Sequence, residues 1–306
     1  MGFASEATGW LIDGDASISW QTMQDLLNRA PATVARERAR VATTGWGKRL
    51  LEKQDAEGTW AHGVYGPKWI STTYTLLLLR RLGIPPNSLD GRRGCRALWD
   101  RIIVDGGVTW ANTAVMPDVC VTAMFLALDY YFDNRDPRRE EALAWMLDQQ
   151  LPDGGWNCSA RRSGSSHGSF HTTISVLEAL AEIGDPASDT AAGRGREFFL
   201  GHRMYRSHRT GEVSHPSFTK LSFPPRWYYD VLRGLDYFRL VDAPYDERLD
   251  DALELLVTKR RKDGKWPVQN KHQGRVWFDM ETGREPSRWN TLRALRVLDR
   301  YQPSAR

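Results

Sequence analysis

The chain has 306 residues, a formal net charge of +4 and three cysteines. The modest charge comes without a zinc-finger or RNA-binding signature, which argues against a nucleic acid partner. No apolar stretch approaches the roughly 20 residues of a membrane span, and an odd number of cysteines does not make a disulfide framework. We therefore expect a cytoplasmic protein with no membrane span that binds a small, anionic molecule.

Residues 1–34 are expected to form an N-terminal extension that contributes one helix, at "ASISWQTMQDLL" (16–27). From about residue 35 to 302, one turn recurs in which a helix ends in long polar residues and is followed by Gly and then Trp. Three segments share this plan: "LEKQDAEGTW" (51–60), "MLDQQLPDGGW" (146–156) and "VTKRRKDGKW" (257–266). Glycine at this place suits a helix C-cap.

"RIIVDGGVTW" (101–110) is a looser copy of the same turn, so we treat Trp110 as the counterpart of Trp60 and Trp156 in the repeat. These three tryptophans are 50 and 46 residues apart. A period near fifty residues fits a unit of two helices.

Each turn is followed by a helix that is apolar on nearly every face and is therefore expected to be buried. These inner helices are predicted at 71–84, 119–132, 170–183, 227–240 and 289–302. The helices before the turns, such as 136–150 and 246–261, carry charge on one side and should lie outside. Five to six helix pairs in an inner and an outer ring satisfy this pattern. An open solenoid of helix pairs is the structural alternative.

The Gln/Gly/Trp turns resemble the repeats of squalene cyclases, and the overall plan is similar to the β-subunits of protein prenyltransferases. "SFHTTISVLEAL" (169–180) and "PSRWNTLRALRVL" (286–298) also resemble stretches of bacterial stand-alone proteins of this kind. The resemblance implies an all-α fold, a single α/α toroid domain that spans residues 1–306. It implies the fold more firmly than the reaction.

Asp118 and Cys120 stand at the start of one predicted inner helix, and His171 stands at the start of the next. Adjacent inner helices would present both starts at one mouth of the ring. Prenyltransferase β-subunits carry an Asp-x-Cys and a later His that bind catalytic zinc, so the resemblance implies Asp118, Cys120 and His171 as ligands of Zn²⁺. Three protein ligands leave the fourth position open. Cys158 is an alternative to Asp118, and an ordinary N-cap and a core cysteine are the other interpretation.

Basic and aromatic residues gather in the loops that lead into the inner helices. We expect an anionic substrate with an apolar body, and its contacts are predicted at Lys68, Arg226, Arg288, Trp69 and Trp227.

The leading functional hypothesis is a zinc-dependent enzyme that acts on this small molecule inside the toroid. The resemblance implies an isoprenoid-like substrate and a reaction similar to that of a prenyltransferase. The acid motif Asp-x-Asp-Asp of squalene cyclases does not occur in the sequence, and no obligatory partner subunit is visible. One alternative is a zinc hydrolase or lyase that uses an acid–base residue, for which the candidates are His215, Tyr228, Asp230 and Glu281. The other alternative is a non-catalytic binding module with a structural zinc ion, closed by both Cys120 and Cys158.

Overall fold

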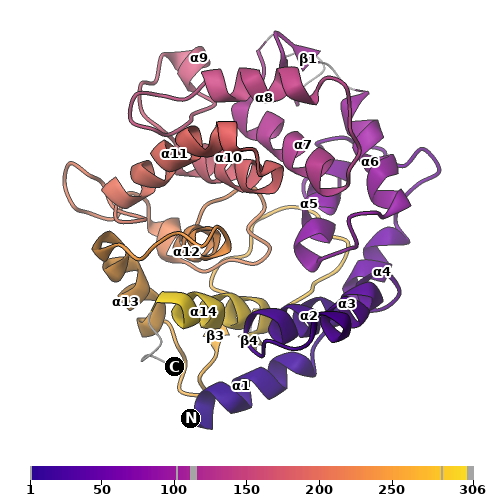
Figure 1. The fold of residues 1–306 in the computed structure, drawn as a ribbon, viewed down its shortest axis with the longest axis vertical. Helices are drawn as coiled ribbons and strands as arrows, with labels where there is room; N and C mark the ends of the chain where they lie inside the picture. Colours follow the sequence, from indigo (N-terminus) through magenta and orange to yellow (C-terminus); the bar gives the residue numbers. More distant parts are fainter. Residues whose placement is uncertain (1, 101–102, 111–115, 284, 302–306) are drawn as a thin grey trace.

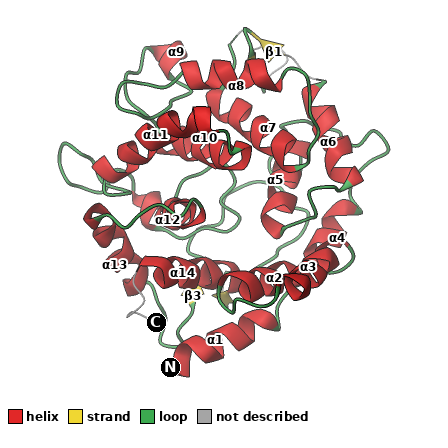
Figure 2. Cartoon of the chain, viewed as in Figure 1, coloured by secondary structure: helices red, strands yellow, loops and turns green. Residues whose placement is uncertain are grey.

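A computed structural model describes residues 2–100, 103–110, 116–283 and 285–301. Nearly all of its regular structure is helical (Figure 2). The helices follow one another around a closed ring and form an inner and an outer layer (Figure 1). The α/α toroid expected from the repeats is therefore confirmed.

The inner layer consists of helices whose side chains are buried along most of their length, as their apolar sequences predict. They are α2 (Ala16–Asp25), α5 (Thr72–Leu82), α7 (Val119–Tyr131), α10 (Phe170–Ile183), α12 (Val231–Leu240) and α14 (Arg288–Tyr301). The outer layer carries polar residues on its solvent side. It consists of α3 (Pro31–Ala39), α4 (Gly45–Leu51), α6 (Leu89–Trp99), α8 (Arg139–Asp148), α11 (Asp189–Gly201) and α13 (Asp250–Thr258).

Short elements complete the loops. The single-turn helix α9 (Ala160–Ser163) precedes α10. Two antiparallel pairs join β1 (Ile103–Val104) to β2 (Gly107–Val108) and β3 (Trp266–Pro267) to β4 (Pro286–Ser287). The 3-10 turns are η1 (Arg40–Ala42), η2 (Pro186–Ser188), η3 (Pro216–Thr219) and η4 (Glu247–Leu249).

The N-terminal segment differs from the expectation of one helix, since residues 2–34 contain α1 (Gly2–Ile12), α2 and the start of α3. Helix α2 closes the ring. Its Trp20 indole donates to the carbonyl of Leu82 at the end of α5 (2.9 Å), and Arg296 of α14 donates to Gln21 and Asp25 (3.0 Å each). Helix α1 packs on the outside against α2 and α14 (Figure 1).

The recurring turn has the same hydrogen bonds in each clear copy. The indole N–H groups of Trp60, Trp156 and Trp266 donate to the carbonyl ten residues earlier, at 2.7, 2.9 and 2.7 Å. Their backbone N–H groups donate to a threonine hydroxyl of the following inner helix, at Thr72, Thr173 and Thr291. Each turn therefore ties the end of an outer helix to the start of an inner one.

In the looser copy, the residue that takes the place of tryptophan lies two positions earlier than predicted. Gly58, Gly106, Gly154 and Gly264 share a positive φ of 77–86°, which glycine adopts at little cost. The residue two positions after Gly106 is Val108, whose N–H donates to Thr122. Trp110 is instead 54% exposed. Valine fills the place of tryptophan in this copy, and the nearby Trp110 gave a misleading spacing.

Candidate functional site

A cavity of about 320 Å³ lies at the mouth where the inner helices begin. Its wall is built by the start of α5 and by two loops, residues 223–226 before α12 and residues 271–281 before α14. The aromatic part of the wall comprises Trp69, Phe223, Trp277 and Phe278. We call this the mouth cavity.

Arg226 is the notable cation of the mouth cavity. Its guanidinium lies 5.5 Å from the ring centre of Trp69 and makes no hydrogen bond or ion pair with another described residue. Burial lowers the pKa of Arg226 to about 10, so the group stays protonated at neutral pH. The other lining cation, Lys271, is already paired with Asp279 at 3.0 Å. Arg226 is thus a partly buried positive charge that faces the cavity and pairs with no carboxylate in the described part of the chain.

Two titratable groups share this wall. His272 stacks on Tyr228 with ring centres 4.1 Å apart, and its Nε2 is buried with no partner among the described residues. Burial lowers the pKa of His272 to about 4. Glu281 accepts hydrogen bonds from the Ser287 hydroxyl (2.5 Å) and the Trp289 N–H (3.1 Å), and burial raises the pKa of its carboxyl group. At neutral pH His272 is therefore a neutral base.

The predicted catalytic residues are dispersed. Glu281 lines the mouth cavity, whereas His215 is exposed and caps the η3 turn through Ser217. Asp230 caps α12 and accepts hydrogen bonds from the N–H of Ser222 and the N–H of Arg233. Tyr228 lies in a stack between Trp227 and His272. The sequence interpretation missed His272, although the surrounding "KHQGRVWF" mixes cations with aromatic residues.

The predicted substrate contacts do not all lie at the mouth cavity. Trp69 and Arg226 line the mouth cavity. Lys68 is exposed, with its ammonium 5.5 Å from the ring centre of Trp227. Arg288 points away to α1, where it donates to the Trp10 carbonyl at 3.2 Å.

The predicted zinc ligands occupy neighbouring helix starts but do not meet in one cluster. Asp118 is buried at the start of α7, where one carboxylate oxygen accepts from Arg162 at 2.8 Å and the other has no partner among the described residues. The backbone N–H of Cys120 and the hydroxyl of Thr172 donate to the Cys158 sulfur, at 3.3 and 3.5 Å. Among the described residues, the ligand atoms of Asp118, Cys120 and His171 are not all within 4.8 Å of one another.

His171 gives a second reason why these residues do not fit zinc in this arrangement. The backbone N–H of Tyr229 donates to His171 Nδ1 at 2.8 Å. Burial lowers the pKa of His171 to about 4, so its ring is neutral at neutral pH. A neutral imidazole that accepts at Nδ1 carries its proton on Nε2, and neither nitrogen then offers a free lone pair to a metal. The same holds for a closed site made with Cys158.

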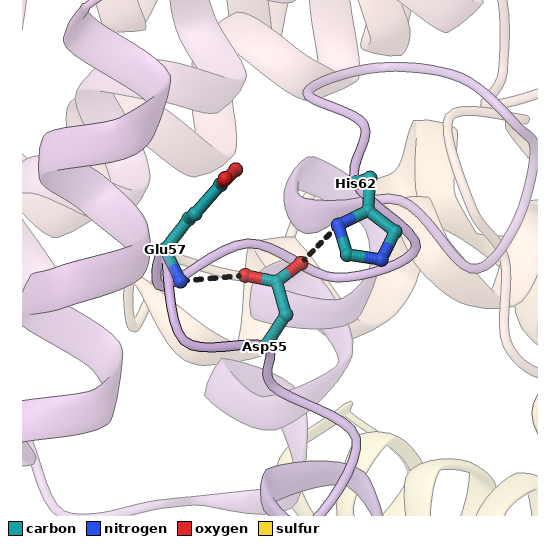
Figure 3. A group of neighbouring side chains, drawn as sticks. All are labelled: Asp55, Glu57 and His62. Atoms are coloured by element: carbon teal, nitrogen blue, oxygen red, sulfur yellow. Dashed lines mark hydrogen bonds and ion pairs between the residues drawn. The ribbon is translucent and has the colours of Figure 1, made fainter.

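Another group of metal-type side chains lies in the first repeat turn. Asp55, Glu57 and His62 bring ligand atoms within 4.8 Å of one another (Figure 3). The Asp55 carboxylate is already engaged, because it accepts from the Thr59 N–H (2.8 Å), the Thr59 hydroxyl (2.5 Å) and the Glu57 N–H (3.1 Å). The His62 side chain is 80% exposed. This group is a solvent-facing part of the turn.

Comparisons with known proteins bear on the fold. No family model and no curated protein matches the sequence. Among solved structures, a protein from Actinoplanes is similar with a TM-score of 0.50 and 16% identity over 94% of this chain and 90% of its own. The chain has an α/α toroid fold, and the Actinoplanes structure is similar to it over nearly its whole length. The type II terpene cyclase MstE from Scytonema is also similar, with a TM-score of 0.47 and 15% identity over 97% of this chain and 98% of its own. No helix in the described part of the chain is long and apolar enough to cross a membrane.

Proposed function

We propose that this protein is an enzyme that binds a small molecule with an anionic head and an apolar, isoprenoid-like body in the mouth cavity and acts on it by proton transfer. The observation that carries the proposal is Arg226, a partly buried guanidinium that faces the cavity and has no carboxylate partner among the residues that the structure describes. A buried cation is costly unless a counter-charge compensates it. A ligand anion at this place would supply the counter-charge.

The remaining wall suits an apolar body. Trp69, Phe223, Trp277 and Phe278 line the space beside Arg226. Aromatic faces attract a cation or an unsaturated chain, and they exclude water from the ligand. The volume of about 320 Å³ is at the lower end for a small-molecule site. A compact molecule therefore fits better than a long chain.

His272 and Glu281 are the groups that would move a proton. The neutral His272 offers an unprotonated ring nitrogen at neutral pH, and the raised pKa of Glu281 means that this carboxyl group keeps its proton to a higher pH than an exposed glutamate. Both line the same cavity as Arg226. The proposal gives no role to zinc, because the predicted ligands do not fit it. A hydrolase or lyase remains the alternative, and in this proposal it would use His272 and Glu281 without a metal ion.

Calorimetric titration with geranyl diphosphate, geranyl phosphate, geranic acid and geraniol tests the proposal. We expect the anionic compounds to bind more tightly than geraniol. Arg226→Met should weaken anion binding by about 1.5–3 kcal/mol, the scale of a charge-assisted hydrogen bond. Arg275→Met is the matched control, since Arg275 is an exposed cation of the other cavity loop, residues 271–281, and does not line the cavity.

Tightest binding by geraniol, with no change in Arg226→Met, would contradict the anionic head. Turnover of a bound compound that survives in both His272→Gln and Glu281→Gln would contradict the proton-transfer roles.

A further inference from the structure

A second cavity, of about 230 Å³, lies at the opposite end of the ring, between the C-terminal parts of the inner helices. Phe223 lines both cavities and stacks on Trp289 with ring centres 4.5 Å apart. We call this second space the arginine cavity. Among the described residues, its lining holds seven arginines and four carboxylates, an excess of three positive charges.

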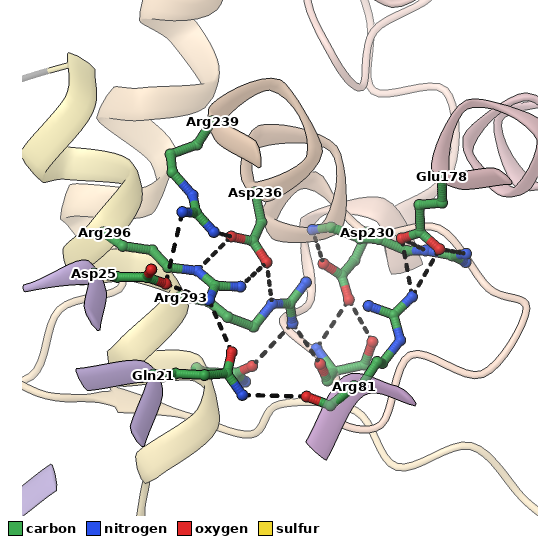
Figure 4. A network of polar contacts seen from close by, with 12 residues as sticks. Gln21, Asp25, Arg81, Glu178, Asp230, Asp236, Arg239, Arg293 and Arg296 are labelled. Carbon is green, nitrogen blue, oxygen red and sulfur yellow. Dashed lines mark hydrogen bonds and ion pairs between the residues drawn. The ribbon is translucent and has the colours of Figure 1, made fainter. Parts of the chain in front are cut away.

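Two of the carboxylates of this lining, Glu178 and Asp236, are each shared by two or more arginines (Figure 4). Glu178 accepts two hydrogen bonds from Arg81 and two from Arg233, all at 2.8–2.9 Å. Asp236 accepts from Arg296 at 2.6 Å through both oxygens and from Arg293 at 3.3 Å. Glu178 and Asp236 are therefore already engaged by several guanidinium groups, and two guanidinium donors of the lining remain without an acceptor among the described residues.

Those remaining donors point to a ligand. The Arg293 side chain is only 3% exposed, and its Nη2 has no partner among the described residues. The Nε of Arg239 is likewise buried without a partner among them. An unsatisfied buried donor on a charged group costs more than a neutral one. Both residues line the arginine cavity.

We propose that the arginine cavity is a binding site for a small multivalent oxyanion, a phosphate or diphosphate group. Such an anion offers several acceptor oxygens to planar guanidinium forks, the geometry in which arginine binds phosphate best. A charge of two to three on the anion matches the excess of three on the lining. The anion is either free or the head of a larger molecule.

This site is distinct from the one proposed for the substrate, because Arg226 and His272 line only the mouth cavity. It gives the protein two separate places for negative charge, one at each end of the inner helices. The two proposals can therefore fail independently.

Leu240 provides the sharpest test, since it lines the arginine cavity and is 54% exposed, so its replacement should not disturb folding. Leu240→Glu adds a carboxylate to the rim of the arginine cavity. Leu240→Gln is the control, because glutamine has the shape of glutamate without its charge. Binding of inorganic phosphate and inorganic diphosphate is measured by calorimetry at constant ionic strength. We expect diphosphate to bind the wild type one to one, and Leu240→Glu to bind it on the order of tenfold more weakly than Leu240→Gln.

Two further variants locate the anion. Arg293→Met should weaken diphosphate binding, and Arg226→Met should leave it unchanged. An organic arm with geranyl phosphate shows the source of the anion. If geranyl phosphate binds with the same affinity as inorganic phosphate, the natural ligand is a free ion. If geranyl phosphate binds more tightly and Leu240→Glu weakens its binding, the anion is the head of a larger molecule.

The proposal is overturned if neither inorganic anion binds at millimolar concentration, or if the Leu240→Glu and Leu240→Gln proteins bind diphosphate equally. Binding that is lost in Arg226→Met and kept in Leu240→Glu would also overturn it. That last result would place the anion in the mouth cavity and leave the proposed function standing.

Discussion

Replacing Glu178 by glutamine tests how the inner helices hold their buried charges. The Glu178 side chain is 13% exposed and bridges Arg81 of α5 to Arg233 of α12. Although burial raises the pKa of Glu178, the charges of Arg233 and Arg81 hold it well below its usual range. The carboxylate is therefore ionised at neutral pH, and Glu178→Gln leaves two guanidinium groups without their counter-charge.

The expected loss follows from the two ion pairs. Each pair of unit charges about 4 Å apart attracts by roughly 4 kcal/mol at an effective dielectric constant of 20. Much of this attraction offsets desolvation, but removal of one partner leaves the desolvation cost of the others in place. Breaking a buried pair in this way costs about 3–5 kcal/mol. We expect a loss of unfolding free energy of about 4 kcal/mol.

Urea denaturation at pH 7 measures this loss from the shift of the midpoint at constant slope. Glu182→Gln is the control, because Glu182 is 24% exposed and its one ion pair with a described residue is with Arg80. We expect a loss of about 1 kcal/mol there. Adding Arg81→Met to Glu178→Gln should recover part of the stability. Equal losses at positions 178 and 182, or no recovery in the double variant, would refute the reasoning.

Three other predictions concern stability and metal content. His171 and His272 have folded-state pKa values of about 4, below the unfolded value of about 6.5, so the unfolded chain takes up protons first as pH falls. The free energy of unfolding should thus decline from pH 6.5 to pH 4, and His272→Gln should make this decline smaller when it is measured by urea denaturation at several pH values. An equal decline in the wild type and His272→Gln would contradict the prediction. Thr173→Val leaves the buried N–H of Trp156 without its acceptor and should cost about 1–3 kcal/mol, whereas Thr258→Val, at an exposed helix end, should cost less than about 0.5 kcal/mol. Protein purified without chelator should hold less than one zinc per chain, and EDTA should leave Tm unchanged; one zinc per chain that is lost in His171→Ala would show that the site rearranges.

The fold could be predicted because its determinants are local and repeat. The glycine with positive φ, the indole of Trp60 or Trp156 and the threonine that follows lie within about one helix pair in sequence. Even there the prediction was wrong at Trp110, because Val108 satisfies the same backbone hydrogen bond without an indole. A pattern of side-chain types does not detect a backbone interaction.

The candidate sites were less accessible to sequence reasoning because they depend on contacts between distant segments. The Nδ1 of His171 is bound by a backbone N–H 58 residues away, which no residue pattern reveals. The charge of Arg226 is important because no carboxylate of the described residues pairs with it. The arginine cavity combines residues of separate helices, and each arginine alone is typical of a solvent-exposed helix end.

Closure of the ring through α2 and α14 has a consequence for synthesis on the ribosome. The polar end of α2 meets its partner Arg296 across more than 270 residues of sequence. One side of α2 therefore stays unpaired during synthesis until α14 has left the ribosome. At about 5–20 residues per second this takes tens of seconds. During that interval the nascent chain is an open arc whose exposed apolar edge needs protection from aggregation.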